Sequence, residues 1–72
     1  MAIFIASCVE TMSKRLGMSA HDMYVRMKTV GLIENYIIPC YDVLHTESRN
    51  NLTDDLINTL YIWEEKRLTI DN

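Results

Sequence analysis

The chain contains few of the residues that interrupt regular structure, with one Pro and two Gly among 72 residues. Nearly half of the residues, 49%, are hydrophobic. This composition excludes the disordered class, whose segments are polar and rich in Pro and Gly. The sequence also lacks internal repeats, low-complexity segments and any useful length of alternating apolar and polar residues. These absences favour a folded helical chain over a β-sheet protein.

Cysteines are also few, because Cys8 and Cys40 are the only two. Two widely separated thiols do not form the framework of a disulfide-rich secreted domain. No apolar run approaches the roughly 18 residues that a membrane-spanning helix needs. The apolar residues 3–6 lack the basic region that opens a signal peptide, and Glu10 follows them closely. We therefore expect a cytoplasmic protein whose two thiols pack as small hydrophobic groups.

The net charge of −3 is divided unevenly along the chain. Residues 1–31 hold four basic against two acidic side chains, a balance of +2, and residues 32–72 hold three against eight, a balance of −5. An acidic chain is unsuited to general nucleic-acid binding. The asymmetry is compatible with head-to-tail association or with a basic patch confined to the N-terminal half.

The length of 72 residues corresponds to a single domain, 1–72. A domain of this size buries only about 60% of the surface of its unfolded chain, so its core is marginal. Small domains commonly compensate through disulfides, a bound metal or association with a partner. We expect association in this case, with a homo-oligomer or a protein partner and no membrane contact.

Apolar residues recur at spacings of three and four through most of the chain. This period predicts an all-α, compact small bundle of about four helices, at approximately 3–16, 19–30, 32–45 and 50–67. Gly17 is placed to end the first helix in a left-handed conformation, and Ser19 is placed to cap the second. Gly31 ends the second helix, and residues 68–72 are expected to form a frayed tail.

Pro39 falls inside the third predicted helix. An interior proline removes one backbone hydrogen bond and clashes with the preceding turn, at a cost of about 3 kcal/mol. The sequence leaves two alternatives open. The segment forms a kinked helix, or it forms a short turn that ends at Ile38 and a new helix that starts at Pro39.

The fourth predicted helix has Thr53 as a candidate N-cap, with Ser48 and Asn50 as alternatives for an earlier start. Its apolar positions exceed what one face of a small bundle needs. The main stripe comprises Leu52, Leu56, Leu60 and Trp63, and a second set comprises Ile57, Tyr61 and Ile62. Because aromatic residues anchor protein interfaces, the second set together with Trp63 is a candidate partner contact. Trp63 is equally suited to closing the bundle, and the two roles are compatible.

The run from 35 to 48 gathers tyrosine, cysteine, aspartate and histidine side chains. Asp42 and His45 are three residues apart, so their side chains can meet on a helix. An Asp–His pair is one ingredient of a general base or a metal site. The set is incomplete, so we predict no catalytic, metal or cofactor site and no enzyme. His45 is instead expected to cap the C-terminal end of the third helix. His45 and Thr46 are retained as candidates for partner contact.

An alternative function comes from residues 10–28, which resemble a helix-turn-helix with its turn at 17–19. This interpretation assigns possible DNA contacts to Lys14, Arg15, Arg26 and Lys28. The second helix offers few of the side chains that read base edges, and Arg26 stands where an apolar packing residue is usual. DNA binding therefore ranks below protein binding.

Gly31-Leu-Ile-Glu-Asn-Tyr36, Cys40-Tyr-Asp-Val-Leu-His-Thr46 and the leucine-rich acidic helix that follows resemble a family of short bacterial proteins classified only as a domain of unknown function. The resemblance extends roughly from Ile5 to Trp63, and residues 41–46 are its most specific part. Family members are often encoded beside small toxin-like or transferase-like proteins. The resemblance implies an antitoxin-like or accessory binding role, and it assigns no catalytic residues. The leading hypothesis is a helical interaction module that binds itself, the product of a neighbouring gene, or both.

Overall fold

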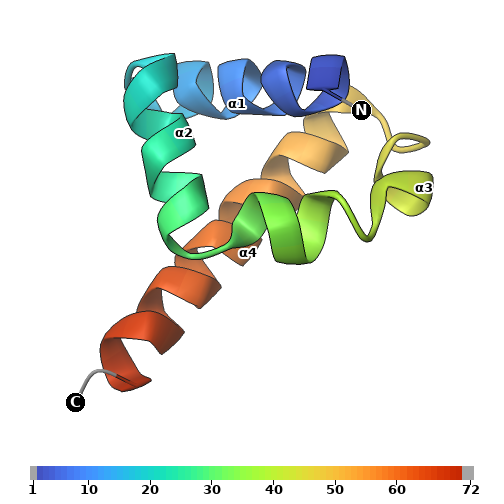
Figure 1. The fold of residues 1–72 in the computed structure, drawn as a ribbon. Helices are drawn as coiled ribbons and strands as arrows, with labels where there is room; N and C mark the ends of the chain where they lie inside the picture. The colour runs from blue at the N-terminus through green and yellow to red at the C-terminus, as the bar shows by residue number, and fades with distance from the viewer. Residues whose placement is uncertain (1, 71–72) are drawn as a thin grey trace.

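The computed structural model describes residues 2–70, with side chains as far as residue 67. The first two helices are α1 (Ala2–Leu16) and α2 (Ala20–Thr29), which meet at a sharp corner (Figure 1). Gly17 adopts a left-handed φ of 68°, and the Met18 N–H donates to the Ser13 carbonyl at 2.9 Å. These features form a Schellman C-cap. The Ser19 hydroxyl accepts from the Asp22 N–H at 3.1 Å, which confirms the predicted N-cap.

Gly31 lies between α2 and the next helical segment. Two features of this position favour glycine. Its φ of 76° lies in the left-handed region. A Cβ at this position would also lie 2.5 Å from the side-chain nitrogen of Asn35. The Gly31 carbonyl accepts a hydrogen bond from the Asn35 N–H at 2.9 Å, so the next helical turn forms directly over the glycine.

The third predicted helix is broken at residues 38–40. Its first part is the π-helix η1 (Ile33–Ile37), in which the Ile38 N–H donates to the Ile33 carbonyl at 3.0 Å. Its second part is the short helix α3 (Tyr41–Leu44). Pro39 has no N–H, and its ring would clash with the carbonyl of Asn35 in a regular helix. The wider π turn separates these groups. The structure therefore agrees better with the prediction of a short turn followed by a new helix than with a kinked helix, although α3 starts two residues after Pro39.

The last helix is α4 (Arg49–Ile70), which starts one residue earlier and ends three later than expected. The Ser48 hydroxyl accepts from the Asn51 N–H at 3.3 Å, so Ser48 caps the helix and the Thr53 prediction is wrong. Thr53 is instead buried, and its hydroxyl donates to the Arg49 carbonyl at 2.8 Å. Residues 68–70 of the expected frayed tail continue the helix, and residues 71–72 lie outside the described residues.

The helices are arranged as an open frame crossed by one long helix. In Figure 1, α1, α2 and η1 follow three sides of the frame, and α4 runs diagonally across it with its C-terminal end projecting. The buried residues from all five helices form one core, comprising Cys8, Val9, Met12, Met23, Met27, Leu32, Ile33, Ile37, Leu44, Leu52, Leu56, Ile57 and Leu60. The core therefore confirms the leucine stripe of α4 and the core placement of Met12, Met23 and Met27.

The predicted all-α bundle is confirmed, because residues 2–70 contain helices and turns and no strand. None of the helices in this part of the chain combines the length and the apolar character that crossing a bilayer requires. The two thiols in the bundle are free, with Cys8 buried and Cys40 half-buried.

Candidate interaction surface

One exposed aromatic surface lies where α4 passes the C-terminal end of α1. A shallow hollow in this place is lined by Arg15, Leu16, Asp54, Ile57, Asn58 and Tyr61. Tyr61 is 47% exposed and Ile62 beside it is 51% exposed. We call the group Arg15, Leu16, Asp54, Asn58, Tyr61 and Ile62 the Tyr61 surface.

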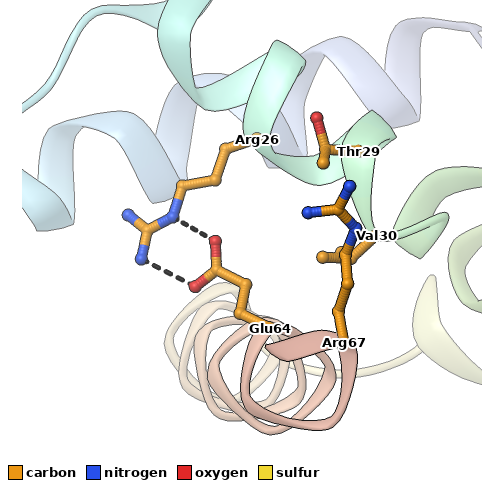
Figure 2. A pocket seen from close by; sticks show the side chains of 5 residues that line it. All are labelled: Arg26, Thr29, Val30, Glu64 and Arg67. Atoms are coloured by element: carbon orange, nitrogen blue, oxygen red, sulfur yellow. Dashed lines mark hydrogen bonds and ion pairs between the residues drawn. The ribbon is translucent and has the colours of Figure 1, made fainter. Parts of the chain in front are cut away.

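Ion pairs border Tyr61 on two sides. On the α1 side, Arg15 contacts Asp54 of α4 at 2.5 Å. On the α2 side, the Arg26 guanidinium donates to both carboxylate oxygens of Glu64, at 2.5 and 2.9 Å, as Figure 2 shows. Arg26 also lies 5.5 Å from the Tyr61 ring centre. This surface consists of an aromatic side chain surrounded by fixed charges, the arrangement of an interface anchor and its polar rim.

The Arg26–Glu64 pair is the best protected of these contacts. Both side chains are about three-tenths exposed, and the bidentate fork restricts their orientation. The hydrogen bond to Glu64 raises the pKa of Arg26 above its ordinary value. A hollow of about 320 Å³ lies beside the pair and is also lined by Thr29, Val30 and Arg67 (Figure 2). The pair therefore fixes the end of α2 against α4 as well as one border of the Tyr61 surface.

Two of the predicted contact residues belong to the core side of α4. Ile57 is only 8% exposed and packs in the core, so the expectation that it offers a free contact surface is corrected. Trp63 packs against the core and meets the Tyr36 ring edge-on at 5.9 Å, which gives it the bundle-closing role. The remaining candidates on this helix, Tyr61 and Ile62, keep their exposed positions.

His45 and Thr46 lie at the end of α3, on the opposite side of the molecule from the projecting half of α4 (Figure 1). The His45 Nδ1 lies 2.7 Å from the Tyr41 carbonyl and donates to it, and the imidazole stacks on the Tyr41 ring at 4.7 Å. Thr46 donates to the Val43 carbonyl at 2.8 Å. His45 therefore caps the helix, as the sequence predicted. Neither residue lines the hollow at Tyr61.

Each of the four basic residues assigned to DNA contact has a carboxylate partner within this chain. Arg15 and Arg26 pair with α4, as described above. Lys14 pairs with Glu10 at 3.0 Å, and Lys28 lies 3.9 Å from Glu34. The positive charge of these four residues is thus balanced by acidic residues of the same molecule.

A third hollow, which the sequence did not reveal, lies between α1, α2 and η1. It is lined by Ala2, Ile5, Ala6, Val9, Glu10, Ala20, Tyr24 and Ile33 and encloses about 530 Å³. We call it the α1 groove. Its sequence signal is weak, because three small alanines and residues from three separate helices form it. Each of these residues has an ordinary place in a helical pattern when it is considered alone.

Two further groups, Cys8 and Tyr36, have raised pKa values that follow from their packing. Burial raises the pKa of Cys8 to about 11, against a smaller opposing effect of Arg49, so this thiol stays protonated. The Tyr36 hydroxyl donates to Asp55 at 2.6 Å, and this hydrogen bond, aided by burial, raises the Tyr36 pKa to about 12. Within the described part of the chain, no group of three His, Cys, Asp or Glu residues is placed to hold a metal ion.

Comparison with known proteins identifies a family. The family described as "Protein of unknown function (DUF3791)" matches residues 3–63. The match covers most of the 72 residues, so the chain belongs to this family. It agrees with the resemblance that residues 31–46 carry. Neither a curated protein nor a solved structure shows significant similarity to the chain.

Proposed function

We propose that this member of the DUF3791 family is a non-enzymatic interaction module. In this proposal the chain binds the product of a neighbouring gene through the Tyr61 surface, in an antitoxin-like or accessory role, and associates with itself. The observation that carries the proposal is the exposure of Tyr61 between two ion pairs. Tyr61 is 47% exposed and lies beside the Arg15–Asp54 and Arg26–Glu64 contacts.

The physical argument concerns the cost of ordering side chains on binding. Immobilising a long side chain in an interface costs about 0.5–1.5 kcal/mol. Arg26 and Glu64 are already held by their bidentate contact in the free chain. A tyrosine loses little rotamer freedom and contributes a large contact area. A partner that covers Tyr61 and Ile62 therefore gains apolar burial without ordering the charged border.

Co-expression of the chain with the product of the adjacent gene tests this proposal. We expect the two proteins to co-purify, and Tyr61→Ala and Ile62→Glu to weaken the complex at least tenfold. His45→Ala and Thr46→Ala test the second candidate contact, at the end of α3. Retention of full affinity by the Tyr61 and Ile62 variants would reject the Tyr61 surface, and loss of affinity in the α3 variants would place the contact at α3 instead.

The alternative is a helix-turn-helix DNA-binding regulator that uses residues 10–28. It is favoured by the tight 17–19 turn between α1 and α2 and opposed by the ion pairs of its four basic residues. A gel-shift experiment at low salt with the promoter of the chain's own operon separates the two functions. The DNA-binding function requires a shift that disappears when Lys14, Arg15, Arg26 and Lys28 are neutralised, and the interaction module requires none.

A further inference from the structure

We propose that the α1 groove binds a second copy of this chain, with the two α1 helices antiparallel across a twofold axis near Ala6. This inference deepens the self-association in the proposed function and rests on it. It uses a surface on α1, α2 and η1, whereas the partner contact proposed above uses the Tyr61 surface. The two contacts are therefore separable by mutation.

The composition of the α1 groove distinguishes it from the Tyr61 surface. Seven of its eight lining residues are apolar, and Glu10 is the exception. The hollow of the Tyr61 surface has three polar or charged residues among six. Interfaces between identical subunits are more apolar than those of transient complexes, which resemble ordinary protein surface. The apolar α1 groove therefore suits permanent association better than a transient partner.

The same face of α1 carries both a hollow and a projection that fits it. Ile3, Ala6 and Glu10 follow one another at spacings of three and four, so they lie along one face of the helix. Ala6 and Glu10 line the groove, and Ile3 beside them is 86% exposed. A twofold interface requires a surface that is complementary to itself. Ile3 of each copy can enter the groove of the other, where Ala6 allows close approach.

Charge selects the antiparallel orientation. Residues 1–9 contain no acidic side chain, and Glu10 is the first along the chain. The first N–H groups of α1 have no partners within the helix, and this helix end carries partial positive charge. In an antiparallel pair centred on Ala6, Glu10 of each copy, which also pairs with Lys14 of its own helix at 3.0 Å, lies against the first turn of the other α1. A parallel pair would bring the two Glu10 carboxylates together, which is unfavourable.

Sedimentation equilibrium of the full chain tests the proposal. We expect a mass twice the 8.4 kDa of one chain at micromolar concentration. Ile3→Glu places a charge in the interface and should weaken the dimer by at least ~10-fold. Ile62→Glu is the matched control, because it makes the same change at another exposed isoleucine, and it should leave the dimer intact. A wild-type chain that stays monomeric, or a dimer lost only in Ile62→Glu, would overturn the proposal.

Oxidative cross-linking tests the position of the twofold axis without depending on stability. A cysteine at Ala6 lies opposite its own copy, within the Cα separation of about 4.4–6.8 Å that a disulfide needs. Ala6→Cys should therefore form a covalent dimer, whereas Asn58→Cys and the wild-type chain, which retains Cys8 and Cys40, should not. Equal cross-linking of Ala6→Cys and Asn58→Cys would contradict the arrangement.

Partner binding is measured in the same variants. Ile3→Glu should keep its affinity for the neighbouring gene product, and Ile62→Glu should lose it. Failure of the partner to bind any variant would reject the Tyr61 surface while the dimer result stands. Loss of partner binding in Ile3→Glu alone would show that the groove is a partner site and would overturn the dimer proposal.

Discussion

The α1 groove and the Tyr61 surface differ in how their polar groups are satisfied. The Tyr61 surface lies where segments of opposite charge meet, and ion pairs from α1 and α2 to α4 enclose its aromatic residue. The α1 groove has Glu10 as its one charged lining residue, and Glu10 pairs with Lys14 of the same helix. Charged contacts between helices therefore determine one surface, whereas small and apolar side chains determine the other.

The uneven distribution of charge along the chain contributes to this difference. The excess positive charge of residues 1–31 is compatible, on sequence alone, with head-to-tail association between molecules. In the structure, Arg15 and Arg26 use that charge to hold α4 within one molecule. The asymmetry therefore contributes to the packing of the monomer and to the border of the Tyr61 surface.

Substitutions of the adjacent α4 residues Leu60 and Tyr61 should have different effects on the stability of the fold. Leu60 is fully buried, and Leu60→Ala should lower the free energy of unfolding by about 2–5 kcal/mol because it leaves a cavity. Tyr61→Ala should change it by less than about 1 kcal/mol because this side chain is half exposed. Urea unfolding followed by Trp63 fluorescence measures both. A similar loss in the two variants would show that the Tyr61 surface is part of the core.

The groove side of the molecule depends on the turn at Gly31. Gly31→Ala should destabilise the fold by about 1–2 kcal/mol from the left-handed φ alone, with a further cost from the contact with Asn35. Gly17→Ala is the matched control, since its φ is 68° but no atom lies within 4 Å of the added Cβ. Thermal unfolding should rank Gly31→Ala as the less stable. Adding Asn35→Ala should recover part of the difference, and no recovery would exclude the steric contribution.

The two ion pairs beside Tyr61 should differ in strength. Arg26→Gln breaks a bidentate, partly buried contact and should cost about 1–2 kcal/mol of stability. Arg15→Gln breaks a more exposed pair and should stay within about 0.5 kcal/mol. Chemical denaturation at low and at high salt provides the comparison. Equal losses of stability in the two variants would show that the two ion pairs contribute equally, which would contradict the prediction.

The hydrogen bond from Tyr36 to Asp55 joins η1 to α4, and its contribution should depend on pH. Tyr36→Phe should cost about 1 kcal/mol near neutral pH. The pKa of Tyr36 is raised from 10.0 to about 12 in the folded chain, so folding favours the protonated phenol. This stabilisation is complete below pH 10 and is lost as the pH rises towards 12. The stability difference between wild type and Tyr36→Phe should therefore shrink over that interval. A constant difference would rule out the hydrogen bond as its source.

Much of the fold was predictable because its signals are local. The left-handed Gly17, the Ser19 cap and the apolar stripes depend on residues within one or two turns of each other. Thr53 was assigned wrongly because Ser48 offers a cap five residues earlier, and the added turn of helix buries Leu52. Pro39 predicted that the third helix is broken. The sequence did not predict that the segment before the break is a π-helix, in which Ile33 and Ile37 are both buried in the core.

The candidate surfaces were less predictable from sequence. Ile57 and Tyr61 are four residues apart, so a helical pattern places them on the same face of α4, yet Ile57 is buried and Tyr61 is exposed. The difference comes from the position of α1 and α2 relative to α4, which no local pattern records. The α1 groove escaped prediction for the same reason, because its walls come from residues as far apart as Ala2 and Ile33.

The sequence by itself determined that this chain is helical, where α1 and α2 begin and end, and which stripe of α4 enters the core. Helical period and capping depend on short-range geometry, so the order of residues specifies them directly. The tertiary structure alone decided that positive charge in one half holds the acidic helix, that Tyr61 lies between two ion pairs, and that a groove opens beside Ile3. Exposure and ion pairing depend on which helices pass one another, and that arrangement is a property of the folded chain as a whole.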